Sequence, residues 1–112
     1  MSGFFGVAGM GRRTGATGSA EEGDVVALVP EPSNAYDPNA VVVLDAAQRR
    51  IGRIRRVHSA VLAELLGTET VRVEQVRCHR IVHNPSLRLT IKVDFRGPRS
   101  QLESLLGSLQ GA

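Results

Sequence analysis

A polar segment at residues 31–40 holds the side chains best suited to chemistry in this 112-residue chain. It carries the only tyrosine, Tyr36, directly before Asp37, and two amide side chains at Asn34 and Asn39. Its two prolines fix φ and push the preceding residues out of the helical region, while Asn and Asp bond their own backbone in turns. A stiff loop that presents a ring, a carboxylate and amides is suited to binding. The alternative is that these residues only build a turn.

Arginine clustering is the second chemical signal. The chain has 14 basic and 11 acidic residues, and all but one of the basic residues are arginine. Guanidinium groups bind phosphate bidentately and stack on bases, so a cluster favours a nucleic-acid partner. The alternative is a GC-rich genome that encodes arginine on a solvated surface, although such a bias does not explain the clustering. The clustered residues are Arg49, Arg50, Arg53, Arg55 and Arg56.

The remaining reactive side chains form no catalytic or metal-binding pattern. His79 and His83 lie in a predicted strand, where four residues span about 13 Å at about 3.3 Å per residue. With Cys78 they make no credible zinc site. His58, at a predicted helix start, is expected on the surface or in packing. Phosphate-loop, nucleophile-elbow and paired-carboxylate motifs are absent from the sequence. We therefore expect no enzymatic activity, no cofactor and no metal.

Composition predicts a small cytoplasmic domain. The hydrophobic content is 42% with four aromatic residues, so the core must consist mostly of Val, Leu and Ile, which suits strands. The lone Cys78 fits a reducing compartment. Neither a membrane-spanning apolar run nor a secretory signal is visible, so no membrane partner is expected.

Apolar runs on both sides of the polar loop predict buried strands at residues 24–29 and 40–45. Further strands are predicted at residues 4–8, 50–54, 71–82 and 87–95, and helices at residues 57–66 and from residue 100 onward. We expect a bend or bulge at Gly52, because Ile51 and Ile54 must both be buried, and an irregularity near Glu74.

About six strands with one or two short helices predict a mainly β (α+β) fold, a small OB-like or SH3-like β-barrel. The barrel is assigned to residues 1–98, and residues 99–112 form a short amphipathic helix or tail. Its apolar residues either cap the barrel or form a dimer contact, so the chain is expected to be a monomer or a weak homodimer. These residues are Leu102, Leu105, Leu106 and Leu109.

These segments carry a family resemblance. Gly23 and Asp24 open a strand, and residues 31–43 read Glu-Pro-x-Asn-x-Tyr-Asp-Pro-Asn-Ala-Val-x-Val. Residues 51–54 read Ile-Gly-x-Ile ahead of an Ala/Leu-rich helix. Over about residues 4–95 the chain resembles the HIRAN domain, in the form of its small stand-alone bacterial members. The family has an OB-like barrel, and its best-understood members bind the 3′-hydroxyl end of single-stranded DNA.

The resemblance implies a site on the polar loop and the arginine cluster. Tyr36 matches the tyrosine that stacks on the terminal base, and Asp37 matches the aspartate that accepts a hydrogen bond from the 3′-hydroxyl. Arg53 and Arg56 match basic positions that face phosphates. Asn34 either holds the loop or bonds the last nucleotide.

Two aromatic positions of the family correspond less directly to residues of this chain. Phe95 matches an aromatic that packs beside the terminal nucleotide, with core packing as the alternative. Where the family has an aromatic near the end of the first strand, this chain has Arg12 and Arg13. A guanidinium either stacks on the base in its place, or half of the stacking sandwich is missing.

The resemblance thus implies a module that recognises 3′ ends of single-stranded DNA in repair or replication-fork processing, beside a helicase or nuclease. The alternative is a protein-interaction or scaffold module that keeps the barrel and has lost end binding. RNA ends are a third candidate, because no residue visibly excludes a 2′-hydroxyl.

Overall fold

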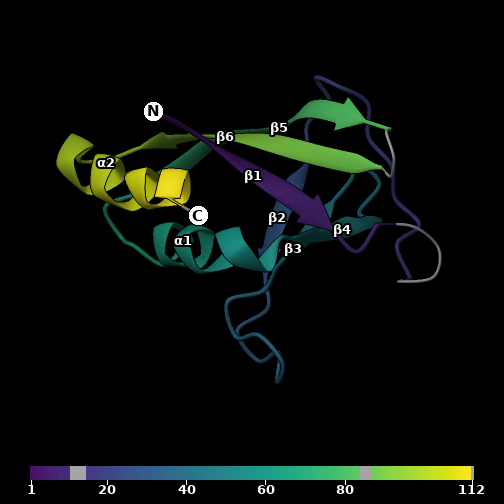
Figure 1. Ribbon diagram of the computed structural model, residues 1–112, viewed down its shortest axis with the longest axis horizontal. Helices are drawn as coiled ribbons and strands as arrows, with labels where there is room; N and C mark the ends of the chain where they lie inside the picture. The colour runs from purple at the N-terminus through teal and green to yellow at the C-terminus, as the bar shows by residue number, and fades with distance from the viewer. Residues whose placement is uncertain (11–14, 84–86, 112) are drawn as a thin grey trace.

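The computed structural model describes residues 1–10, 15–83 and 87–111, with side chains to residue 109. Within this part of the chain, six strands and two α-helices follow one another, closed by a 3₁₀ turn (Figure 1). The elements are β1 (Ser2–Ala8), β2 (Ala27–Pro30), β3 (Val41–Leu44), β4 (Arg50–Ile54), α1 (Arg56–Leu66), β5 (Arg72–Val82), β6 (Arg88–Arg96), α2 (Arg99–Gly107) and η2 (Ser108–Gly111). The predicted mainly β fold with two short helices is confirmed.

The strands form one antiparallel sheet in the order β2-β3-β4-β1-β6-β5, so β1 is central. The sheet curls, and the segment just before β2 bonds back to the outer edge of β5. The N–H of Val26 donates to the carbonyl of Val76 at 3.1 Å, and the N–H of Cys78 donates to the carbonyl of Asp24 at 2.8 Å. The sheet is thereby linked across its two edges, as in a barrel.

This link corrects the predicted strand at residues 24–29. The β2 strand begins only at Ala27, where it pairs with Leu44 of β3. Val25 instead forms an isolated bridge with Arg77 of β5 and is exposed. The apolar run therefore serves two different strands, which periodicity alone does not reveal.

The core lies between the inner face of the sheet and the helices. On β6 every second residue is buried, namely Leu89, Ile91, Val93 and Phe95. The predicted bulges are confirmed by register shifts in β4, beside Gly52, and in β5 between Val73 and Gln75. A Cβ atom at Gly52 would lie 2.4 Å from the carbonyl oxygen of Ala8, so the glycine lets β1 approach β4.

The two α-helices lie together along one side of the long strands (Figure 1). Leu62 and Leu65 of α1 are fully buried, and Leu102 of α2 belongs to the same apolar core. Leu106 and Leu109 pack partly buried against it. The C-terminal leucines therefore cover the barrel. No helix in the described residues has the length and apolar character needed to cross a membrane.

Candidate nucleic-acid interface

The polar loop projects from the barrel between β2 and β3, and its backbone is closed by hydrogen bonds (Figure 1). At its base the N–H of Glu31 donates to the carbonyl of Ala40 at 2.8 Å. Two internal turns follow, from Asn34 N–H to the Glu31 carbonyl and from Ala40 N–H to the Asp37 carbonyl, each at 3.0 Å. The loop is therefore a folded unit.

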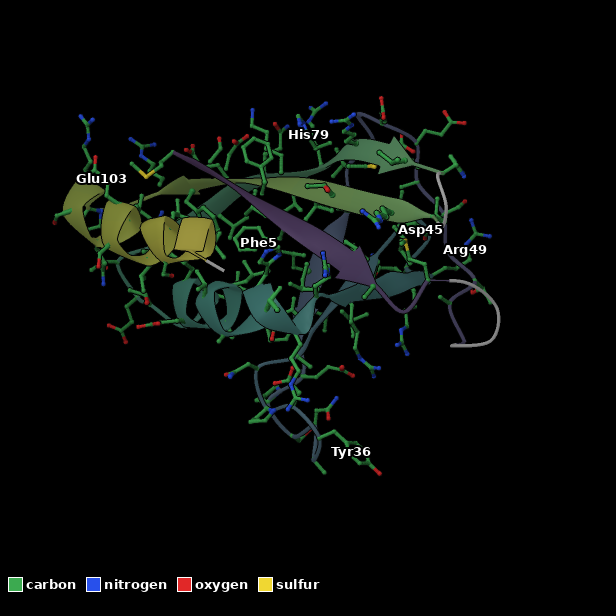
Figure 2. All side chains as sticks on the ribbon, viewed as in Figure 1. Phe5, Tyr36, Asp45, Arg49, His79 and Glu103 are labelled. Atoms are coloured by element: carbon green, nitrogen blue, oxygen red, sulfur yellow. The ribbon has the colours of Figure 1, made fainter. Side chains whose placement is uncertain are left out.

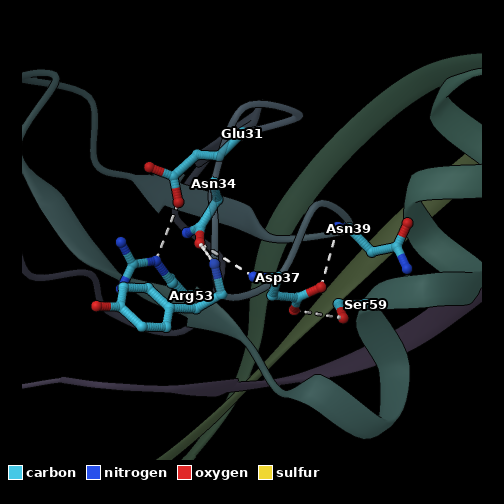
Figure 3. Close-up of polar contacts among 7 residues, drawn as sticks. Glu31, Asn34, Asp37, Asn39, Arg53 and Ser59 are labelled. Carbon is cyan, nitrogen blue, oxygen red and sulfur yellow. Dashed lines mark hydrogen bonds and ion pairs between the residues drawn. The ribbon is translucent and has the colours of Figure 1, made fainter.

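Side chains of the loop complete its frame. The Asn34 Oδ1 atom accepts hydrogen bonds from the N–H groups of Tyr36 at 2.9 Å and Asp37 at 3.1 Å (Figure 3). This is the turn-holding role that Asn and Asp side chains commonly take. Asn34 uses its acceptor within the loop, while its amide N–H groups remain as donors. The contacts of Asn34 therefore support its role in holding the loop.

Asp37 connects the loop to the first helix. Its Oδ1 atom accepts from the Asn39 N–H at 3.0 Å, and its Oδ2 atom accepts from the Ser59 hydroxyl at 3.3 Å (Figure 3). Ser59 is buried in the first turns of α1 and can instead donate to the Arg56 carbonyl at 3.2 Å. A carboxylate offers about four lone pairs, so Asp37 keeps free acceptor capacity. The partner Ser59 was not predicted from sequence.

The Tyr36 ring is presented to solvent. Its side chain is 91% exposed and stands at the tip of the projecting loop (Figure 2). Large aromatics are seldom left so exposed without a role, because burying them is strongly favourable. The hydrogen bonds that Asn34 Oδ1 accepts from the N–H groups of Tyr36 and Asp37 hold the backbone from which the ring projects.

Arg53 reaches the loop from β4. Its Nε atom donates to Glu31 Oε1 at 3.0 Å, and both side chains are partly exposed (Figure 3). Arg53 thus has part of its charge balanced and keeps its terminal N–H groups. Arg56 is exposed and has no ion pair among the described residues. Glu31 is a second site residue that the sequence did not indicate.

The start of α1 adds a local positive field. Arg55 occupies the N-cap position, no side chain caps the helix, and its first turn holds no acidic residue. The free N–H groups of a helix N-terminus attract anions. The sequence already indicates that these N–H groups are uncapped, because residues 53–56 contain no Ser, Thr, Asp or Asn that could cap the helix.

His58 ties this helix start to β1. Its Nδ1 atom accepts a hydrogen bond from the Gly6 N–H at 3.0 Å, and its ring makes a T-shaped contact with Phe5. Burial, and then the nearby Arg55 charge, hold the pKa of His58 below its usual value. The neutral ring is a packing element, one of the two roles expected for it.

Of the other candidates, Phe95 does not join this cluster. Phe95 is 1% exposed and makes a T-shaped contact with Phe5, so it belongs to the core and lies outside the candidate site. It occupies the inward face of β6, as the alternation of that strand requires. Arg12 and Arg13 lie outside the described residues.

Asp45 is buried at the far end of the sheet from α2 (Figure 2). It accepts hydrogen bonds from the N–H groups of Ala47 and Arg49 at 2.9 Å and from the Arg49 side chain at 3.2 Å. The backbone bond from Arg49 is the main cause of a lowered Asp45 pKa, and burial opposes it. Asp45 holds the β3–β4 turn, where Gln48 adopts a φ of 65°.

No metal centre is apparent in residues 1–10, 15–83 and 87–111, since no three His, Cys, Asp or Glu side chains cluster there. Cys78 is buried in the core, and burial raises the pKa of its thiol.

Sequence comparison identifies one family. A model of the HIRAN domain matches residues 2–98. The helicase-like transcription factor of Oryctolagus cuniculus is 26% identical over 94 residues, which cover 84% of this chain and 9% of that protein. The matched segments make up only 6% to 9% of the lengths of the curated relatives.

Solved structures share the fold. The crystal structure of the HIRAN domain of human HLTF aligns with a TM-score of 0.75 at 20% identity, covering 98% of this chain and 87% of that one. An NMR structure of the HLTF HIRAN domain in its DNA-bound conformation aligns with a TM-score of 0.67 at 21% identity, covering 98% and 86%.

Proposed function

The chain belongs to the HIRAN domain family, and from this we propose that it binds the 3′-hydroxyl end of single-stranded DNA. One observation carries the proposal: a loop closed by its own hydrogen bonds holds an almost fully exposed tyrosine, which is followed in the chain by a carboxylate with free acceptor capacity. That a related domain has been solved in a DNA-bound conformation supports DNA as the ligand.

Tyr36 supplies stacking on the terminal base. Base–aromatic stacking contributes roughly 1–3 kcal/mol per base and tolerates any sequence, which suits a reader of ends. Because the loop is already folded by its own hydrogen bonds, little conformational entropy has to be lost on binding.

Asp37 reads the chemistry of the end. An ionised carboxylate only accepts hydrogen bonds, so it favours a hydroxyl and repels a 3′-phosphate. The bonds from Asn39 and Ser59 orient the carboxylate without exhausting its lone pairs. Asp37 therefore acts as a filter as well as a contact.

The start of α1 and its arginines bind the adjoining phosphates. Arg56 is exposed and unpaired in the described structure, and the uncapped helix end adds N–H donors. Arg53 would contribute through its terminal N–H groups, in competition with Glu31. A module of this kind would present DNA ends to a helicase or nuclease during repair or fork processing.

A protein-interaction module is the competing function. Such a module would need an exposed apolar surface, but the leucine-rich C-terminal segment lies against the barrel with Leu102 in the core. That apolar surface is used within the fold, which favours the DNA-end reader.

The test is fluorescence anisotropy with a labelled single strand that ends in a 3′-hydroxyl, compared with the same strand ending in a 3′-phosphate. We expect clear preference for the hydroxyl, loss of affinity in Tyr36→Ala, and retention in Tyr36→Phe, which keeps the ring. Equal binding of the two strands would refute the end reader. Binding of neither would favour the protein-interaction module.

A further inference from the structure

The outer face of the long strands carries a second concentration of positive charge. Cross-strand pairing places Phe4, Lys92 and Arg77 in one row, because Phe4 pairs with Lys92 and Lys92 pairs with Arg77. The next row contains Arg80, opposite Thr90. These positions face away from the core, since Ile91 and Val93 between them are buried. The basic residues of this outer face are Arg72, Arg77, Arg80, Arg88, Lys92 and Arg96.

The positive charge of this face is balanced only in part: Glu22 lies at the edge of β5, where it accepts a hydrogen bond from the Ile81 N–H at 3.0 Å. Strands β1, β5 and β6 hold those six basic residues and only two acidic ones, Glu74 and Asp94, a net charge of four positive against +3 for the entire chain. None of the six basic side chains forms an ion pair within the described structure. Arg77 donates to the Gly23 carbonyl, which orients its guanidinium and leaves the charge in place.

An exposed aromatic pair lies within this basic field. Phe4 is 47% exposed, and its ring centroid lies 4.8 Å from that of His79 with the planes tilted by 57°. A phenyl ring left exposed on a sheet among cations is how proteins form stacking platforms for unpaired bases. Arg88 and Arg96 are eight residues apart on β6, so the face extends over about 26 Å at about 3.3 Å per residue. That length accommodates several nucleotides.

This face is separate from the polar loop. His79 lies on the side of the sheet away from α1, whereas Tyr36 hangs below the helix (Figure 2). We infer that the outer face of β1, β6 and β5 is a second binding surface for single-stranded nucleic acid, with Phe4 stacking on a base and Lys92, Arg77 and Arg80 contacting phosphates. This surface needs no strand end and does not depend on the function proposed for the loop.

A covalently closed circle of single-stranded oligodeoxythymidine tests the inference, because it has no 3′ end for Tyr36 and Asp37 to read. The wild-type domain is expected to bind the circle, and a Tyr36→Ala/Asp37→Asn variant to bind it almost equally. Phe4→Thr should weaken binding by about 5- to 150-fold, the loss expected for one base stack, and Phe4→Tyr should retain it.

Charge variants supply the second readout. Lys92→Gln should reduce the magnitude of the slope of log affinity against log salt by about 0.7, the value for one single-strand phosphate contact. Arg99→Gln, which removes one exposed charge from α2, should leave the slope unchanged. Failure of the wild type to bind the circle would overturn the inference, while binding of linear 3′-hydroxyl ends would still stand. Equal affinity for a closed duplex, insensitive to Phe4→Thr, would also overturn it.

Discussion

Asparagine at position 37 separates the recognition role of Asp37 from its role in holding the loop. Asp37→Asn keeps the size of the side chain and one acceptor oxygen, but removes the charge. A hydrogen bond to a charged group is worth about 1.5–3 kcal/mol and one to a neutral group about 0.5–1.5 kcal/mol, so loss of the charge should raise Kd for 3′-hydroxyl DNA by about 5- to 15-fold.

The cost in stability should be small. Asn can still accept from either Asn39 at 3.0 Å or Ser59 at 3.3 Å, so about one ordinary hydrogen bond is lost. Such a bond contributes about 0.5–1.5 kcal/mol, against a total stability of about 5–15 kcal/mol for a typical domain. Urea denaturation followed by circular dichroism measures this change, and anisotropy measures Kd.

Ser59→Ala is the matched control, because it breaks the same contact from the helix side. Ser59 is 1% exposed, and alanine fits its space without a clash. We expect the variant to lose a similar amount of stability and to keep its DNA affinity. If Ser59→Ala weakens end binding as much as Asp37→Asn does, Asp37 acts only through the shape of the loop, and the hydroxyl-reading argument is refuted.

Three further measurements probe the fold and its electrostatics. The lowered His58 pKa means that the unfolded chain binds a proton more readily, so stability should be complete above about pH 6.5 and fall as pH drops through the folded-state pKa. His58→Gln should flatten that part of the stability profile, and an unchanged profile would exclude His58 as its cause. Gly52→Ala should lower the free energy of unfolding by about 1–3 kcal/mol, because the added Cβ atom would overpack against the Ala8 carbonyl. Gly107→Ala is the control, since a Cβ atom there meets open space, and its melting temperature should be nearly unchanged. Similar melting temperatures for the two variants would contradict the close approach of β1 and β4. A plot of log affinity for linear 3′-hydroxyl DNA against log salt should have a slope near −1.4 if Arg53 and Arg56 each contact one phosphate. The slope should be about −0.7 if Arg53 stays paired with Glu31, and about twice −1.4 if Arg12 and Arg13 also contact phosphate. A slope near zero would reject the electrostatic part of the proposal.

Local patterns in the sequence predicted most of the fold. The strand predicted at residues 87–95, the helix predicted at residues 57–66 and the turn chemistry of the loop depend on neighbouring residues, and the structure contains all three, although Val57 lies exposed on its helix. The β-branched run before the loop was misjudged because its first half pairs with β5 and its second half with β3. Which strand a residue pairs with is decided by the curl of the whole sheet.

The candidate site was predictable in its residue types and less so in its contacts. The pairs Arg53–Glu31 and Asp37–Ser59 each join residues that are 22 positions apart, so they depend on how β4 and α1 pass the loop. Asp45 depends on a distant segment in the same way, because it accepts a hydrogen bond at 3.3 Å from the N–H of Ser19, which belongs to a different loop. The sequence left Phe95 with two possible places, the core or the binding site, and its inward position on β6 assigns it to the core.

The central position of β1 has a consequence for how the molecule folds. Ser2 pairs with Asp94 and Val7 with Leu89, so the middle of the sheet joins the first strand to the last. Pairing between such distant segments is slow to form, because a long stretch of chain must be ordered before it contributes. The polar loop, by contrast, is held mostly by bonds within residues 31–40. During synthesis the loop can take shape early, whereas the barrel that supports it must wait until residues 88–96 have left the ribosome.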